Sequence, residues 1–213
     1  MHATTEQEQV EALKAWWHTQ GKKVLIAFGT AFVIWIGWKY WEHHQEVRKA
    51  QASEDFFVIM QAVEEDDYGT FQEHAKQLMD QYADTPYASL ASLLWANHEI
   101  KDPAAAKTHL QWVVDHASDR VFSDIARARL ARLLLNEKSY DSAIAMLKKM
   151  KTTAFEGLRD EITGDVYTAK GDIDAARAAY TIALKSEIIG GEGRRAFIEM
   201  KLNDLGPAPA AKE

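Results

Sequence analysis

Apolar residues are spread very unevenly along the chain. Residues 24–38 read VLIAFGTAFVIWIGW, fifteen positions without a charge, and five of the seven tryptophans fall within the first 41 residues. The rest of the chain mixes apolar and polar positions with the spacing of amphipathic helices. The pattern therefore predicts an apolar helix near the N-terminus, followed by a body of paired helices.

The apolar run is short for a membrane span, and its flanks decide the interpretation. Fifteen helical residues cover about 22 Å, whereas a hydrocarbon core is about 30 Å thick. Counting to Trp41 gives about 27 Å, which fits a thin bilayer. Val, Leu, Ile and Phe fill eight of the fifteen positions, and each contributes roughly −0.3 to −0.6 kcal/mol to insertion. We predict a transmembrane helix over residues 24–41; a soluble core helix and a cleaved signal peptide are the alternatives.

Residues that suit the membrane–water interface flank this helix. Lys22 and Lys23 precede it, and their long stems can carry the amines to the interface. Trp38, Tyr40 and Trp41 close it as an aromatic belt. We predict that these five residues anchor the helix. Lys and Arg are balanced on the two sides, three against three, so charge favours a cytoplasmic N-terminus only slightly, through the adjacent lysine pair.

Two polar segments border the predicted span. Residues 1–23 are expected to form a cytoplasmic N-terminal amphipathic segment, in which Thr5 and Glu8 have capping-box spacing. A solvated helix and an interfacial helix with its Trp pair at the headgroups are both open interpretations. Residues 42–53 contain no Gly or Pro, which predicts a helical stalk that continues the span.

Repeated helix–turn–helix pairs are predicted over residues 54–205. Gly164 and Ala176 are small residues that let two helices approach closely, as in the tetratricopeptide pattern, and Ala143 lies 33 positions before Ala176, close to the ~34-residue period. The pairs cover residues 54–83, 87–117, 124–150 and 157–185. The sequence therefore predicts an all-α fold, with a single transmembrane helix, a tetratricopeptide-like α-solenoid of about four helical hairpins, and a disordered tail over residues 206–213.

Composition and motifs argue against several functional classes. The chain has no Cys, which excludes a disulfide scaffold, a thiolate zinc site and a Cys nucleophile. A net charge of −7 is not typical of a nucleic-acid binder. The histidines lack metal-ligand spacing, and the acidic run over residues 64–67 lacks that of a calcium loop. We predict no enzyme, no cofactor, no metal site and no nucleic-acid partner.

A protein-binding face is the remaining candidate site. Arrays of helical pairs present a concave face built from the first helix of each pair. The tetratricopeptide register predicts Trp95 and His98 on this face, followed by Arg132 from the next pair and Glu161 and Asp165 from the last. An exposed Trp beside mixed charges would suit an extended peptide. The alternative is that Trp95 is a core residue, because it stands in the apolar run LLWA.

Five ordered blocks resemble a known family. They are QVEALKAWW, IGWKYWEHHQ, TPYASLASLLWA, AKGDIDAARAAY and EMKLNDL. In order and spacing they resemble the ancillary SecYEG translocon subunits of Gram-negative bacteria (the YfgM type) over almost the whole chain. The family has no catalytic residues to carry over.

The resemblance implies a location and partners that the pattern alone does not. It implies a single-pass inner-membrane protein with a cytoplasmic N-terminus and a periplasmic repeat domain. Its expected partners are the SecYEG translocon, a membrane-anchored periplasmic chaperone of the PpiD type, membrane lipid, and unfolded or nascent secreted proteins. The alternative is an envelope-assembly or stress-signalling scaffold with the same architecture and no translocon role.

Overall fold

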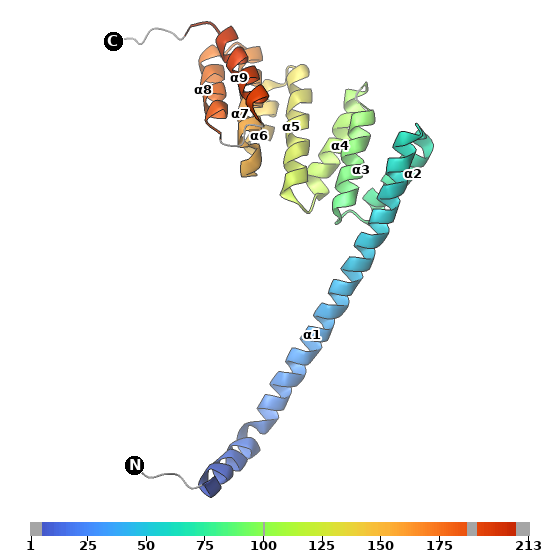
Figure 1. Ribbon diagram of the computed structural model, residues 1–213, viewed down its shortest axis with the longest axis vertical. Coiled ribbons are helices and arrows are strands. Elements are labelled where there is room, and N and C mark those ends of the chain that lie inside the picture. Colours follow the sequence, from blue (N-terminus) through green and yellow to red (C-terminus); the bar gives the residue numbers. More distant parts are fainter. Residues whose placement is uncertain (1–5, 100, 187–190, 208–213) are drawn as a thin grey trace, which may run out of the picture. The chain divides into compact units, whose positions relative to one another are not determined.

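The computed structural model describes residues 6–99, 101–186 and 191–207, and in these ranges every regular element is a helix (Figure 1). The prediction of an all-α fold is confirmed. The elements are α1 (Glu6–Glu64), α2 (Tyr68–Gln81), α3 (Pro86–His98), α4 (Pro103–His116), α5 (Arg120–Asn136), α6 (Tyr140–Lys148), the 3₁₀ helix η1 (Thr153–Phe155), α7 (Glu156–Lys170), α8 (Ile173–Lys185) and α9 (Glu192–Asp204).

The chain divides into two compact units, Met1–Ala50 and Gln51–Glu213. The first unit is the greater part of α1, and its large apolar side chains from Leu25 to Trp41 are exposed. Taken singly, no helix of the described residues is both long and apolar enough for a membrane span. Two stretches of α1, Lys14–Lys23 and Leu25–Glu64, meet that requirement together, by length and composition only, with a 40° bend between them.

The second unit begins within α1, whose last turns pair with α2. Ala52 and Ile59 on α1 share a buried cluster with Phe71 and Leu78 on α2. The Asp55 carboxylate also joins the two helices, because it accepts a hydrogen bond from the Gln77 amide at 3.0 Å. The first helix of the first pair is thus the end of a 59-residue helix that also includes the predicted stalk.

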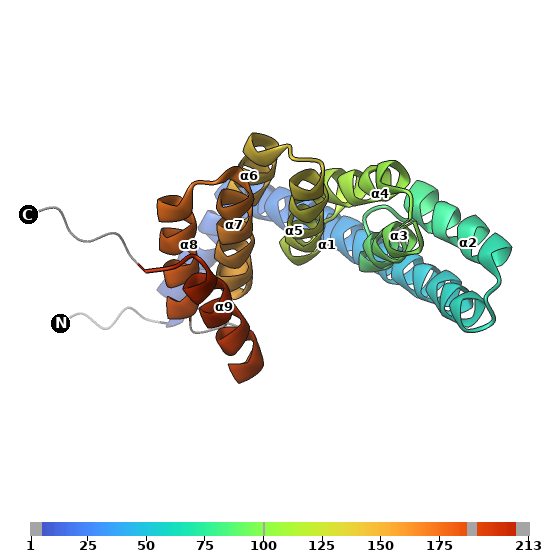
Figure 2. The same cartoon turned by 90° about the horizontal axis from the view of Figure 1, so that it is seen from above.

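Three further pairs follow, α3–α4, α5–α6 and α7–α8, and each packs on the next (Figure 2). Their positions match the predicted pairs. A helix that the sequence analysis did not identify, α9, packs against α8 after the last pair and buries Ile198. The predicted capping residues Thr5 and Glu8 lie outside the part whose side chains are described, and so do residues 208–213 of the predicted tail.

Short polar side chains cap the N-termini of several helices by accepting hydrogen bonds from backbone amides. Thr85 caps α3 and accepts a hydrogen bond from the Ala88 amide, and Pro86 stands in the first turn. Asp172 caps α8 in the same manner by accepting from the Ala175 amide. Between α7 and α8, Gly171 has a φ of +84°, a backbone conformation that glycine adopts without a steric penalty.

A buried carboxylate ties α5 to the segment that follows α6. Asp124 is fully buried and accepts hydrogen bonds from the Lys151 and Thr152 amides at 2.9 and 2.8 Å. Arg127 donates to its other oxygen at 2.6 Å. Burial by itself would raise the pKa of Asp124, but these hydrogen bonds outweigh burial and lower it. One ionised side chain therefore holds the connection between the α5–α6 pair and the α7–α8 pair.

Candidate functional site

Trp95, the central residue of the predicted face, is half-buried between the first two pairs. Its ring stacks on His109 of α4, with centroids 4.3 Å apart and an interplanar angle of 19°. It also meets Phe71 of α2 edge-on at 6.0 Å. Such aromatic pairs stabilise packed interiors. Trp95 therefore contributes to the contact between α2, α3 and α4, which supports the core interpretation.

His98, one turn further along α3, is exposed, and its ring also contacts Phe71. Its ring centroid is 4.8 Å from that of Phe71 and 5.8 Å from that of Tyr68. Arg132 on α5 is also exposed, and its charge adds to burial in lowering the pKa of Arg129. Of the five residues predicted for the face, these two are the ones whose side chains remain open to solvent.

Glu161 and Asp165 on α7 are engaged by α9. Glu161 is only 3% exposed, and it accepts from Arg194 at 2.5 and 2.9 Å and from Lys201 at 2.9 Å. Asp165 accepts from Lys201 at 2.8 Å and from the Tyr180 hydroxyl at 2.7 Å. Burial acts to raise the pKa of Glu161, but the two cations lower it overall. The last pair therefore uses its predicted binding carboxylates to hold the chain's own C-terminal helix.

The five predicted residues consequently fall into separate sets of contacts. Trp95 and His98 belong to the aromatic packing around Phe71. Glu161 and Asp165 pair with Arg194 and Lys201 of α9, and we refer to these four residues as the ionic cluster under α9. Arg132 joins neither set. The sequence placed these residues on the first helices of successive pairs, α3, α5 and α7, but the register could not show that α9 covers two of them.

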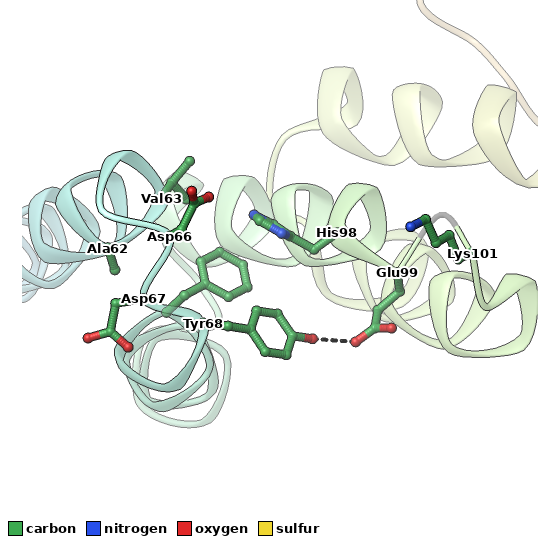
Figure 3. Close-up of a pocket in the computed structure, with 9 residues that line it drawn as sticks. Ala62, Val63, Asp66, Asp67, Tyr68, His98, Glu99 and Lys101 are labelled. Atoms are coloured by element: carbon green, nitrogen blue, oxygen red, sulfur yellow. Dashed lines mark hydrogen bonds between the residues drawn. The ribbon is translucent and has the colours of Figure 1, made fainter.

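A hollow of about 420 Å³ opens where the α1–α2 turn meets the C-terminal end of α3, and we refer to it as the turn pocket (Figure 3). Its aromatic wall is made by Tyr68 and Phe71, whose rings stack with centroids 5.9 Å apart. The Tyr68 hydroxyl donates to Glu99, and both burial and this carboxylate raise the tyrosine pKa. The lining residues are Ala62, Val63, Asp66, Asp67, Tyr68, Phe71, His98, Glu99 and Lys101.

Of the residues that line the turn pocket, only His98 belongs to the predicted binding face. Asp66 and Asp67 belong to the acidic run over residues 64–67, which lacks the spacing of a calcium loop, and Tyr68 and Phe71 directly follow that run. The available signal was the pair of aromatic residues three positions apart directly after an acidic turn. Among the residues that the structure describes, no group of three or more His, Cys, Asp or Glu side chains has an arrangement suited to a metal ion.

The predicted anchoring residues lie in the first unit, on α1. All five are exposed, and the rings of Trp38 and Trp41 lie 5.7 Å apart on one side of the helix. Lys39 between them forms an ion pair with Glu42 at 2.7 Å. Aromatic side chains on consecutive turns next to charged residues are the arrangement found at membrane–water interfaces.

Comparison with known proteins connects this architecture to a family. The model of the tetratricopeptide repeat-like domain matches residues 14–207. A protein of Haemophilus influenzae named ancillary SecYEG translocon subunit is 29% identical over 206 residues, which cover 96% of this chain and 99% of that protein.

Two further relatives bear the same name. The Escherichia coli protein is 27% identical, with 94% of this chain and 96% of the relative covered. The Neisseria gonorrhoeae protein is 26% identical, with 94% and 97% covered. The resemblance found in the sequence is confirmed by these end-to-end similarities. Because the family model covers most of the chain and the structure shows the helical pairs that it describes, this protein belongs to the tetratricopeptide repeat-like domain family.

Proposed function

We propose that this protein is a membrane-anchored interaction subunit of the SecYEG translocon. The observation that carries the proposal is the similarity to three ancillary SecYEG translocon subunits over at least 94% of the chain. Because the similarity includes the apolar segment as well as the repeats, the relatives and this chain share one arrangement of parts. The chemistry of a helical-repeat domain is binding, so we assign no reaction to it.

In this proposal each segment of the chain has its own location. Residues 24–41 span the inner membrane, residues 1–23 are cytoplasmic, residues 42–53 form the stalk, and residues 54–205 form the periplasmic domain. The exposed apolar side chains of α1 support a lipid-facing span, because a helix that is apolar on all sides needs an apolar surrounding. The orientation follows the Lys22–Lys23 pair and the family resemblance.

The proposed mechanism is tethering. A span beside the translocon holds the repeat domain where secreted proteins emerge, so a weak binding surface acts at a high effective concentration. Cooperation with a PpiD-type periplasmic chaperone in handling secreted and envelope proteins is part of the proposal. An envelope-assembly or stress-signalling scaffold remains the alternative function.

Crosslinking from the anchor tests the translocon assignment. A photoreactive amino acid replaces Tyr40 in one variant of the full chain and Glu137, an exposed residue directly after α5, in a matched control. We expect SecY, SecE or SecG in the Tyr40 crosslink and not in the control. Recovery of other envelope proteins only, in repeated experiments, would favour the alternative scaffold.

Two simpler measurements test the membrane arrangement. Extraction of membranes with alkaline carbonate should leave the full chain in the pellet. Reporter enzymes fused to the C-terminus should be active when they function in the periplasm and inactive when they require the cytoplasm. A cytoplasmic C-terminus would remove the periplasmic chaperone from the proposal while leaving contact with the translocon to be decided by the crosslink.

A further inference from the structure

The turn pocket presents open aromatic faces. The Tyr68 side chain is 39% exposed, and its ring is stacked on Phe71, which is itself 1% exposed and held by the Trp95 edge contact. The Tyr68 hydroxyl is also fixed by its hydrogen bond to Glu99. Because the ring is held on two sides, it offers a preformed surface. The face of an aromatic ring attracts cations and planar guanidinium groups.

Three carboxylates line the turn pocket, and that of Asp66 is unengaged. Asp66 and Glu99 stand on opposite sides of the Tyr68 ring, whereas Asp67 points away from the other labelled residues (Figure 3). Asp67 caps α2 by accepting from the Thr70 amide at 3.1 Å and from its hydroxyl at 2.7 Å. Glu99 is occupied by the Tyr68 hydroxyl. Within the described ranges the Asp66 carboxylate has no hydrogen-bond or ion-pair partner.

The lining of the turn pocket is therefore acidic on balance. It includes three carboxylates and one ammonium group, that of Lys101. Glu64 and Glu65 precede Asp66 in the same turn and increase the negative potential. A volume of about 420 Å³ falls within the range of sites that hold small ligands or single side chains. Rings with carboxylates on either side form the combination that recognises a cationic group.

We infer that the turn pocket binds one basic side chain, preferably arginine, of an extended peptide segment. The guanidinium group lies against the exposed face of Tyr68 and pairs with Asp66, while Glu99 remains held by the tyrosine. This inference deepens the proposed function, since it names the chemistry that the interaction domain recognises. Arginine is preferred over lysine because its planar group both stacks on a ring and forms two parallel hydrogen bonds with a carboxylate.

Lys101 gives the inference a distinctive consequence. Its ammonium group is the one positive charge in the pocket lining, and it lies near Glu99 on the side away from Asp66 (Figure 3). A bound arginine is repelled by this charge. Removing it should therefore strengthen binding, whereas most substitutions in a binding site weaken it.

The test measures binding of a defined peptide to the full chain in nanodiscs, by fluorescence anisotropy at low salt. The probe is the fluorescein-labelled peptide Ser-Gly-Ala-Ser-Arg-Ser-Ala-Gly-Ser, and the reference peptide replaces arginine by its neutral isostere citrulline. We expect the arginine peptide to bind at least fivefold more tightly, with an affinity that falls as salt is added. Translocon components are absent from this assay, so its failure is distinct from a failure of the crosslinking experiment.

Variants locate the binding. Asp66 has a φ of +56°, which asparagine also tolerates, so Asp66→Asn preserves the turn and should weaken binding three- to fivefold. Glu65→Gln removes the same charge from an adjacent exposed residue outside the pocket and should change binding less than twofold. Tyr68→Ala should abolish the preference for arginine, and Lys101→Met should tighten binding about twofold. Equal binding of both peptides, or equal losses for Asp66→Asn and Glu65→Gln, would overturn the inference.

Discussion

The ring of Tyr180 on α8 lies directly against the backbone of Gly164 on α7, where a β-carbon would lie 2.5 Å from its Cδ1 atom. This is closer than real β-carbons approach, so the two residues define how near α7 and α8 can come. Tyr180 is also fixed at its far end, because its hydroxyl donates to Asp165. The small residue and the aromatic ring together make the close pair predicted from the tetratricopeptide spacing.

Adding a single methyl group at this contact should loosen the last pair. Gly164→Ala should lower the free energy of unfolding by about 1–3 kcal/mol, because a fixed ring cannot move away without strain. Urea unfolding of the full chain in detergent, followed by circular dichroism, measures the change. The control is Gly193→Ala in α9, where an added β-carbon meets nothing within 4 Å. An equal effect of both variants would show that the close approach does not limit stability.

Asp124 should make stability depend on pH in the acidic range. Its pKa is lowered in the folded chain, so the unfolded state takes up protons first, and stability is lost as pH falls from about 4 through the folded value. Asp124→Asn should cost about 1–3 kcal/mol at pH 7, because one amide or guanidinium donor loses its acceptor.

Urea titrations at pH 7 and pH 3.5 measure this dependence. The difference between the parent chain and Asp124→Asn should shrink at the lower pH. Asp174→Asn is a change of the same type at an exposed position of α8. Its free energy of unfolding should be close to that of the parent chain at both pH 7 and pH 3.5. A gap that stays constant with pH would contradict the assignment of an ionised Asp124.

The ionic cluster under α9 should control how firmly that helix is held. Glu161→Gln removes the charge that pairs with Arg194 and Lys201, so local opening of α9 should become more frequent. Hydrogen exchange followed by mass spectrometry should then show faster exchange over residues 192–204. The matched variant Glu199→Gln, on the exposed side of α9, should exchange like the parent chain. Unchanged exchange in both variants would argue that the apolar packing of Ile198 and Leu202 holds the helix without the ionic cluster.

Stability measurements also separate the two interpretations of Trp95. If Trp95 contributes to the core, Trp95→Ala should cost at least about 2 kcal/mol, since it removes the contacts with His109 and Phe71. Arg132→Ala, at an exposed site on the next first helix, should stay within about 0.5 kcal/mol. Small effects for both, together with a loss of peptide binding in Trp95→Ala, would instead favour the predicted concave face.

Much of the fold was accessible from the sequence because it depends on local spacing. The small residues Gly164 and Ala176, the cap at Thr85 and the turn at Gly171 each act within one or two helices, so their pattern is readable along the chain. The predicted insertion of the apolar run over residues 24–38 also rests on local properties, namely composition and length. Helix α9 was not predicted because it follows the last pair and so has no counterpart in the repeat register, although Ile198 and Leu202 on it have helical spacing.

Whether the predicted binding residues are accessible depends on contacts between elements that are distant in the sequence. The repeat register placed Trp95 and Glu161 on first helices, but only the packing of α4 and α9 decided that one stacks on His109 and the other is buried under two cations. The turn pocket likewise joins the α1–α2 turn to the end of α3. Sequence determined the helices, because helix formation is local; tertiary structure decided which side chains stay available, because burial depends on every neighbour that packs against them.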